Sequence, residues 1–339
     1  MRARLELARA QILAFRRRVG ALDERLSPGP ESMRRAACAG LTDSMPRAAL
    51  LSLHARVEDT SPDGWEDPSL VQLWGPRFSA YVVAERDRAV FTLGRLPEGG
   101  KKLERAEHLA ARLRELLGDD RMPYGEAGRA LGVNPNMLRY AAPTGTVLMR
   151  WDGARQPEIW TVPPPDMDPA DARLELARRY LHVFGPSTRD AFAKWAGVTK
   201  RPAEAVFDAL SEELVPVRTP VGDAWILATD EDDFRAEPAS AAPARLLPSG
   251  DAYYLLWGAD RDLLVETPEH RDELWTSRVW PGAVLVEGEI VGTWRRSQHE
   301  VTIGAWDRLS SAATAAVEEE ATSLPLPGLD RDIVVDWDG

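Results

Sequence analysis

The feature of this sequence that most constrains its fold is a block that recurs: two short helices, a tight turn between them, and two strands. The sharpest copy lies just past the middle of the chain. Ser187 or Thr188 can cap its first helix, and Gly197 provides the turn. A second helix is predicted over 202–214, and the residues 215–227 that follow it predict a strand hairpin.

The same block occurs a second time plainly and a third time in blurred form. The plain copy places its helices and strands at 124–131, 134–141, 147–151 and 158–162. The blurred copy, nearer the N-terminus, places its helices at 31–39 and 46–57 and its hairpin at 79–84 and 89–93. A helix-turn-helix followed by a strand hairpin is a winged helix, and several of them in tandem are typical of proteins that handle nucleic acid.

The C-terminal part of the sequence has a different pattern. Short strands separated by turn residues are predicted at 253–257, 283–287, 289–295 and 301–303. This spacing favours a small closed or half-closed sheet. We therefore predict an α+β protein with three tandem winged-helix units followed by a small C-terminal β-barrel. The predicted domains are residues 1–98, 99–165, 166–240 and 241–339.

The charge of the chain argues against nucleic-acid binding as a whole but permits it locally. The net charge is −12, whereas nucleic-acid-binding domains are usually basic. The first 35 residues nevertheless contain nine arginines and only four acidic residues. Because salt screens charges over about 10 Å, an acidic protein can still present one basic face.

Composition also limits the cellular compartment and the cofactor chemistry that can be expected of this chain. The chain has one cysteine, Cys38, so internal disulfides are excluded and a reducing cytoplasm is expected. The sequence contains no apolar run of the ~20 residues that a membrane span needs. Its five histidines lack metal-ligand spacing, and no phosphate-binding or dinucleotide motif occurs. We expect no cofactor, no metal, no membrane association and a monomeric protein.

Several stretches of the sequence resemble a bacterial winged-helix family that includes the AlkZ and YcaQ DNA glycosylases. The matching segments, in the family's order, are Ala39–Leu50, Leu53–Val57, Trp74–Arg77, Phe184–Thr188, Trp195–Val198 and Val284–Arg295. The resemblance implies three tandem winged helices and a β-barrel around a DNA-binding channel. It also implies double-stranded DNA, alkylated or crosslinked, as the partner, and hydrolysis of the N-glycosidic bond of a damaged purine as the activity.

The resemblance places the chemistry just before the helix that starts at Pro46. Glycosylases of this family carry a Gln-x-Gln or Gln-x-Asp pair there, and the matching positions are Thr42 and Ser44, with Asp43 between them. Hydroxyl groups can hold a water molecule, but they reach less far than glutamine and carry no charge. Asp43 is the one carboxylate in the segment, and strand alternation predicts that its side chain points away from its two neighbours.

Two interpretations of this segment remain open. In the first, Thr42, Asp43 and Ser44 are catalytic. In the second, Asp43 or Ser44 caps the following helix by accepting hydrogen bonds from its free N–H groups. The same choice extends to the whole protein: it is either a DNA glycosylase with altered specificity or a DNA-binding protein, such as a lesion sensor or regulator, that has lost catalysis.

Candidate DNA-binding residues follow from their positions beside the expected channel. Many members of the family that this chain resembles carry a histidine at the position equivalent to Tyr81. The other candidates are arginines or lie on the C-terminal hairpin. The predicted set is Arg47, Arg56, Arg77, Tyr81, Arg139, Arg150, Trp294, Arg295, Arg296 and His299. Each arginine is either a phosphate contact or a solvated, ion-paired surface residue. Most of the twelve tryptophans, Trp195 among them, lie in apolar patterns and are expected in the core.

Overall fold

The N-terminal part of the protein is a unit built from helices and a three-stranded sheet. The computed structural model describes residues 4–153, 155–329 and 331–338. The helices of this unit are α1 (Arg9–Val19), α2 (Pro30–Ala36), α3 (Ala48–His54) and α4 (Arg88–Leu93), and its strands are β2 (Leu41–Thr42), β3 (Leu70–Trp74) and β4 (Ala80–Ala84). The strand order is β2-β4-β3.

One predicted hairpin of this unit is wrong. Residues 80–84 do form a strand, but its partner is β3, which precedes it in the sequence. Residues 89–93, the predicted second strand, belong instead to helix α4. A short apolar run has no clear period, so the sequence alone does not distinguish a buried strand from a buried helical turn.

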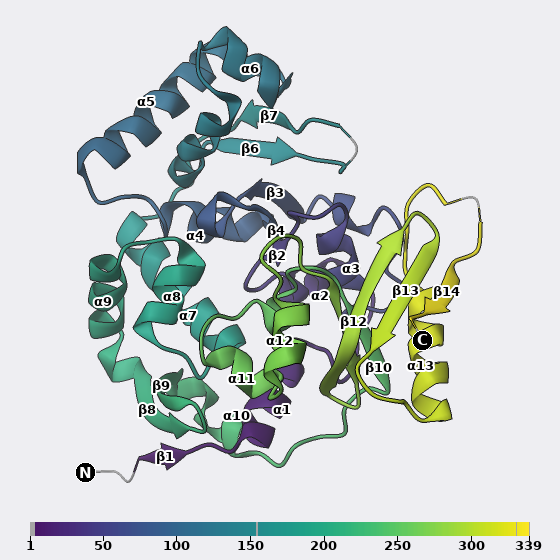
Figure 1. Ribbon diagram of the computed structural model, residues 1–339. Coiled ribbons are helices and arrows are strands. Elements are labelled where there is room, and N and C mark those ends of the chain that lie inside the picture. Colours follow the sequence, from purple (N-terminus) through teal and green to yellow (C-terminus); the bar gives the residue numbers. More distant parts are fainter. Residues whose placement is uncertain (1–3, 154, 330, 339) are drawn as a thin grey trace.

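The second unit repeats the arrangement and stands out from the rest of the molecule at the top of Figure 1. It contains helices α5 (Gly100–Leu117) and α6 (Tyr124–Ala130), a 3-10 segment (Pro135–Thr144), and strands β5 (Met122–Pro123), β6 (Val147–Arg150) and β7 (Glu158–Thr161). The strand order, β5-β7-β6, is the same as in the first unit. The predicted 147–162 hairpin is confirmed.

The third unit follows the predicted pattern most closely. Its helices are α7 (Pro169–Phe184), α8 (Arg189–Ala196) and α9 (Lys200–Ala209), and its strands are β8 (Leu214–Thr219) and β9 (Gly222–Leu227). Thr188 caps α8 by accepting a hydrogen bond from the Ala191 N–H, and Gly197 ends that helix in a left-handed conformation. Ser187 forms an isolated bridge with β9, while the N-terminal strand β1 (Leu5–Glu6) adds to β8.

The C-terminal part is built on an open five-stranded sheet, so the predicted barrel is not formed by the described residues. Its strands are β10 (Ala244–Leu247), β11 (Gly282–Val286), β12 (Glu289–Ser297), β13 (Glu300–Ala305) and β14 (Val334–Trp337), in sequence order. Strand β14 pairs with β13 in parallel, which leaves β10 and β14 at opposite edges. The predicted strand at 253–257 is also wrong, because Ala252–Tyr254 form a 3-10 turn whose side chains are buried.

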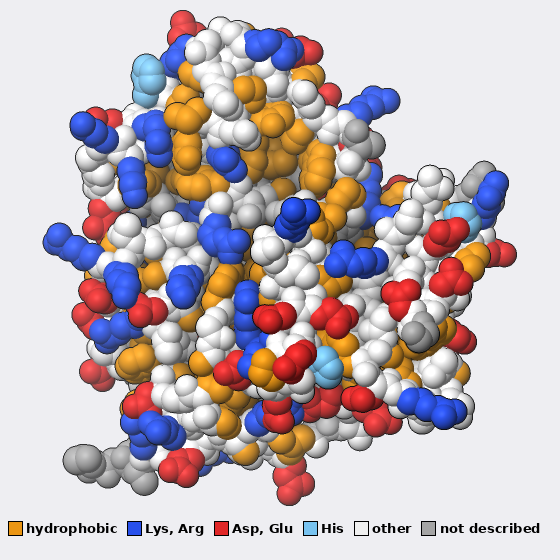
Figure 2. Space-filling model, in the orientation of Figure 1, with side chains coloured by type: hydrophobic (Ala, Val, Ile, Leu, Met, Phe, Trp, Pro, Cys, Tyr) orange, Lys and Arg blue, Asp and Glu red, His pale blue; other side chains and the backbone are white. Residues whose placement is uncertain are grey.

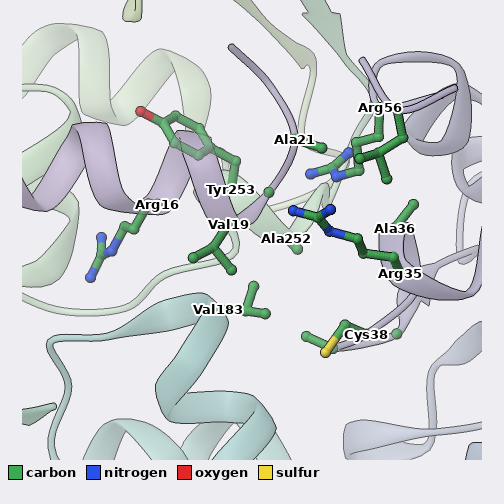
Figure 3. Close-up of a pocket in the computed structure, with 14 residues that line it drawn as sticks. Arg16, Val19, Ala21, Arg35, Ala36, Cys38, Arg56, Val183, Ala252 and Tyr253 are labelled. Atoms are coloured by element: carbon green, nitrogen blue, oxygen red, sulfur yellow. The ribbon is translucent and has the colours of Figure 1, made fainter. Parts of the chain in front are cut away.

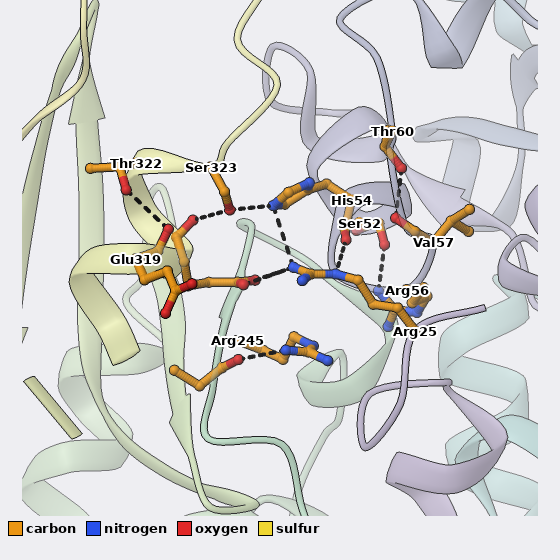
Figure 4. Close-up of polar contacts among 12 residues, drawn as sticks. Arg25, Ser52, His54, Arg56, Val57, Thr60, Arg245, Glu319, Thr322 and Ser323 are labelled. Carbon is orange, nitrogen blue, oxygen red and sulfur yellow. Dashed lines mark hydrogen bonds and ion pairs between the residues drawn. The ribbon is translucent and has the colours of Figure 1, made fainter. Parts of the chain in front are cut away.

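Three helices belong to this part of the chain, and the last two of them pack on the sheet. They are α11 (Asp260–Leu264), α12 (Pro268–Leu274) and α13 (Ser311–Thr322), and a short helix, α10 (Glu231–Arg235), precedes the sheet. Figure 4 shows the polar contacts between α13 and the first unit: Arg25 donates two hydrogen bonds of 2.7 Å to Glu320 and one to the His54 carbonyl. Burial, with the nearby charges of Arg25 and Arg245, lowers the pKa of His54 to about 3, so its ring is neutral at pH 7.

The largest hydrophobic core lies between the first unit, the third unit and the segment that precedes α11. It contains an aromatic cluster of Tyr180, Phe192 and Trp195, and Trp195 is completely buried as predicted. The second unit and the C-terminal sheet have hydrophobic clusters of their own, so the architecture is a mixed α+β fold with several cores. No helix among the described residues has the length and apolar character needed to cross a membrane.

Candidate nucleic-acid interface

The Thr42–Ser44 segment is a loop between a short strand and a helix. Thr42 ends β2 and pairs with Tyr81 of β4, and the Asp43 N–H then donates to the Ala80 carbonyl at 2.8 Å. Helix α3 begins after Arg47, whose φ of 67° is unusual for a residue with a side chain. The end of the sheet therefore fixes the backbone of this loop at its N-terminal side.

The three predicted catalytic residues have different surroundings. The Thr42 hydroxyl donates a hydrogen bond of 2.7 Å to the Gly250 carbonyl, and the side chain is buried. Asp43 is 2 % exposed. Ser44 is exposed. Of the three, only the Ser44 hydroxyl is open to a molecule that approaches from solvent.

Asp43 caps helix α3, as the second interpretation of the sequence expected. Its Oδ1 accepts a hydrogen bond of 3.1 Å from the Ala49 N–H, in the first turn of the helix. Its Oδ2 accepts one of 2.5 Å from Gln72 Nε2. Burial raises the pKa of Asp43 to about 6, although the Ala49 N–H and the Arg47 charge oppose the shift. The carboxylate is therefore ionised at neutral pH but titrates close to it.

Gln72 connects this carboxylate to the second unit. While its Nε2 donates to Asp43, its Oε1 accepts a hydrogen bond of 2.5 Å from the Trp151 N–H, just after β6. Gln72 is itself buried within β3. The turn that joins β6 and β7 also packs closely on the loop, since a Cβ added to Gly153 would lie 2.7 Å from Pro46. The predicted catalytic loop and the hairpin of the second unit thus form one contact region.

Two predicted DNA-binding arginines meet beside the same loop. The Arg47 guanidinium lies over the Trp65 ring at 4.2 Å, and that of Arg150 lies over the same ring at 3.8 Å. Arg150 is also paired with Glu66 at 2.9 Å. Arg47 Nη1 is buried and has no hydrogen-bond partner in the described part of the chain. Glu66 therefore balances the Arg150 charge, whereas Arg47 has no ion-pair partner among the residues that the structure describes.

The structure corrects three of the predicted DNA contacts, because their side chains are buried. Arg56 forms a bidentate ion pair with Asp251, with both N–O distances at 2.7 Å. Tyr81 lies in the core, where close packing against Gly75 and Gly40 leaves it no path to the surface. Trp294 donates from its indole nitrogen to the Leu247 carbonyl inside the C-terminal sheet. These residues stabilise the fold.

The other predicted contacts remain available at the surface. Arg77 is exposed with its guanidinium 4.9 Å from the Trp257 ring, and Arg139 is half-buried in the second unit. Arg295 is exposed, and Arg296 and His299 are half-buried, on the hairpin formed by β12 and β13. Figure 2 shows Lys and Arg side chains over the middle of this face, between the second unit and the rest of the molecule.

Sequence reasoning missed Trp65 and Gln72. Gln72 could have been found, because it is a polar residue inside the apolar strand Leu70-Val-Gln-Leu-Trp74 and a buried amide needs partners. Trp65 lies in a short 3-10 turn with no periodicity, so nothing in the sequence distinguishes it from a core tryptophan.

A small cavity beside this region does not add a ligand site. Figure 3 shows it between α1, α2 and the third unit, with Arg35, Cys38 and Tyr253 among its lining residues. Its volume is about 20 Å³, which is room for one water molecule. Burial raises the pKa of the Cys38 thiol, which disfavours the reactive thiolate.

Comparison with known proteins shows the family of this chain. The model of the AlkZ-like DNA glycosylase family matches residues 34–325, and the chain belongs to that family. An interstrand DNA cross-link repair glycosylase of Streptomyces sahachiroi is 29% identical over 161 residues, which are 46% of this chain and 43% of that protein. The sequence alignment therefore spans less than half of the relative.

Similarity to a solved structure extends over nearly the whole fold. The Streptomyces sahachiroi DNA glycosylase AlkZ superposes with a TM-score of 0.78, covering 98% of this chain and 100% of that one. Sequence identity in this superposition is 18%. At that identity the likeness establishes the architecture, and the activity of this chain has to be argued from its own residues.

Proposed function

We propose that this protein binds duplex DNA and, as a glycosylase, removes alkylated or crosslinked purine bases by hydrolysing the N-glycosidic bond. The observation that carries the proposal is the position of the Thr42–Ser44 loop. In a chain of a glycosylase family, the exposed Ser44 belongs to the loop that leads into Arg47, and the Arg47 guanidinium lies over the same Trp65 ring as that of Arg150. Positive side chains there can hold the phosphates on either side of a damaged nucleotide.

The proposal extends to the architecture that presents the loop. We take the three helix–sheet units as winged helices over residues 1–98, 99–165 and 166–240, followed by a separate C-terminal domain. The shared strand order of the first two sheets, and the place of Ser187 beside β9 in the third, support this division. The duplex would lie across the face where Lys and Arg gather, with the β12–β13 hairpin at its side.

To hydrolyse the N-glycosidic bond of an alkylated purine base, the protein has to place a negative charge and a water molecule beside the sugar. An N7-alkylated guanine already carries a positive charge and leaves without a general acid. The sugar left behind is oxocarbenium-like and is stabilised by nearby negative charge. Ser44 can hold the attacking water, because a hydroxyl both donates and accepts. The Asp43 carboxylate, buried behind the loop and ionised at neutral pH, supplies the negative charge.

A second function is favoured by one specific observation. The Thr42 hydroxyl is engaged by Gly250, and the two Asp43 oxygens are engaged by Ala49 and Gln72. Two of the three groups at the expected catalytic positions thus already have structural partners. A DNA-binding lesion sensor or regulator without turnover is consistent with this arrangement.

An excision assay separates the two functions. Duplex DNA with one N7-alkylguanine is incubated with the natural protein, with Ser44→Ala, and with Thr42→Gln and Ser44→Gln, which restore the family's residues. Release of the base by the natural protein, and its loss in Ser44→Ala, would support the glycosylase. Activity that is confined to the glutamine variants would identify the natural protein as a binder.

DNA binding itself is tested at the C-terminal hairpin. The double variant Arg295→Glu/Arg296→Glu should weaken binding to duplex DNA and reduce the dependence of affinity on salt. The matched control is Arg308→Glu, because Arg308 is exposed beyond the other end of β13. A protein that does not bind duplex DNA at low salt would contradict both functions.

A further inference from the structure

A cleft of about 340 Å³ lies where the three helix–sheet units meet, and the Thr42–Ser44 loop does not line it. Phe78 and Arg95 line it from the first unit, and Val198 lines it from the third, just after α8. Residues of α5 and Tyr140 close it from the second unit. Its volume falls at the lower end of the range that holds small organic ligands, roughly 300–1,000 Å³.

The lining of the cleft is strongly cationic. Arg95, Lys102, Arg105 and Arg173 contribute positive charge, and Glu98 is the one carboxylate among the lining residues. Arg173 already pairs with Glu98 at 2.8 Å. Within the described residues, the other three cations have no ion-pair partner. An anion is therefore the ligand that this cleft would attract.

Arg95 is the least expected of these cations, because it is only 6 % exposed. Its guanidinium donates 3.1 Å hydrogen bonds to the Ala196 and Trp74 carbonyls, which leaves further N–H groups without partners among the residues the structure describes. Burial lowers the pKa of Arg95 to about 10, so it keeps its charge at neutral pH. A buried charge with neutral partners is costly, and an anion in the cleft would compensate it.

Aromatic rings form the other part of the wall. Phe78 and Tyr140 meet edge to face at 4.9 Å, and the exposed Arg105 lies 3.8 Å over the Tyr140 ring. Phe78 and the residue before it have φ values of 61° and 56°, a conformation that non-glycine residues seldom adopt. Strained backbone of this kind is concentrated at binding sites, where contacts made by the positioned side chain offset the cost in conformational energy.

We propose that this cleft binds an unpaired nucleotide of a DNA strand, with its phosphate at Lys102, Arg105 and Arg95 and its base against Tyr140 and Phe78. The inference rests on the proposed function, since it assumes that DNA is the ligand of the protein. A nucleoside phosphate is the ligand class that combines negative charge with an aromatic face. The cleft would hold a nucleotide that has left the duplex, apart from the loop where excision is proposed.

The test compares two DNAs at one salt concentration: a blunt duplex, and the same duplex with a three-nucleotide overhang. Fluorescence anisotropy should show that the overhang tightens binding about tenfold, as expected for stacked bases and their phosphates. Lys102→Ala/Arg105→Ala should abolish this preference and leave blunt-duplex binding largely unchanged. The matched control, Lys101→Ala/Arg114→Ala, removes two exposed cations from the same helix outside the cleft and should keep the preference.

A second variant checks the aromatic wall without changing the charge. Tyr140→Leu should reduce the preference for the overhang, and its circular dichroism should match that of the natural protein. Equal affinity of the natural protein for both DNAs would overturn the cleft proposal while the proposed function stands. Loss of the preference in the control variant Lys101→Ala/Arg114→Ala would also overturn it. Failure to bind even the blunt duplex would overturn both proposals.

Discussion

Two buried carboxylates of this protein have opposite electrostatic surroundings. Asp251 is 0 % exposed and forms a bidentate ion pair with Arg56, supported by the Ser52 hydroxyl at 2.6 Å. Burial alone would raise its pKa, but the Arg56 charge and the hydrogen bonds outweigh that effect, so the pKa is lowered. Asp43 is almost as deeply buried, yet its partners are an amide and a backbone N–H, and its pKa is raised.

Asp251 therefore holds the fold, whereas Asp43 keeps the capacity to change its charge. Full pairing fixes Asp251 in its ionised form, whereas Asp43 retains a charge that its surroundings only partly compensate. One hydrogen bond connects the two segments: the hydroxyl of Thr42, the residue before Asp43, donates to the carbonyl of Gly250, the residue before Asp251. A Cβ on Gly250 would lie 3.0 Å from that hydroxyl, and its φ of +76° also favours glycine.

Removing the partner of Asp251 should have the largest effect. Arg56→Leu leaves a completely buried carboxylate without its cation, which should lower the free energy of unfolding by about 3–5 kcal/mol. Urea denaturation measures the change. The double variant Arg56→Leu/Asp251→Asn should be less destabilised than the single variant, since it removes the uncompensated charge. If both variants lose equal stability, the unpaired charge is not the cause.

Asp43 and Asp251 should contribute to the pH dependence of stability in opposite directions. Its pKa is about 6 in the folded protein and 3.8 as the ordinary value, so the folded protein binds a proton in that window more readily than the unfolded chain. The contribution of Asp43 to stability should therefore increase as the pH falls from 6 towards 4, by up to about 3 kcal/mol. The pKa of Asp251 is lowered, so its contribution to the stability of the protein decreases as the pH falls.

Asp43→Asn isolates this contribution. The variant cannot titrate at this position, so the natural protein should gain stability relative to it as the pH falls from about 7 to about 4. Subtracting the two urea-denaturation series removes the contribution of Asp251 and of every other carboxyl group. A difference that stays constant across this range would contradict the raised pKa.

Removing the amide that supports Asp43 should have a smaller effect. Gln72→Leu deletes one hydrogen bond to the carboxylate and one from the Trp151 N–H, at a cost of about 2 kcal/mol. Hydrogen exchange at the Trp151 amide should accelerate, because that N–H loses its acceptor. Gln156→Leu is the control, since Gln156 is exposed on the same hairpin. Unchanged exchange at Trp151 would mean that Gln72 does not join the two units.

The parts of the fold with strong local signals could be predicted from the sequence. The third unit has a capping Thr188, a turn at Gly197 and alternating strands, and each local preference agrees with the final structure. Residues 89–93 and 253–257 were assigned wrongly, because short apolar segments fit a strand, a helix or a buried turn equally well. The open sheet was missed because β14 joins it in parallel from the far end of the chain.

The structure shows the surroundings of the predicted site residues, which the sequence could indicate only in part. The sequence left open whether Asp43 or Ser44 would cap the following helix, and in the structure Asp43 accepts the hydrogen bond from the Ala49 N–H. It did not indicate that Asp251 would pair with Arg56, 195 positions away. Arginine and tryptophan side chains can serve the surface or the interior equally, so Arg56 and Trp294 could be assigned only once their partners were known.

The smallest expected effect concerns the link between the two carboxylate segments. Thr42→Val keeps the shape of the side chain and removes the hydroxyl, so the Gly250 carbonyl loses its donor in a buried position. The expected loss in the free energy of unfolding is about 1 kcal/mol, as for one buried hydrogen bond. Thr229→Val is the control, because Thr229 is exposed. If Thr42→Val is as stable as this control, the hydroxyl does not hold the two segments together, and Asp43 and Asp251 can then be treated as independent sites.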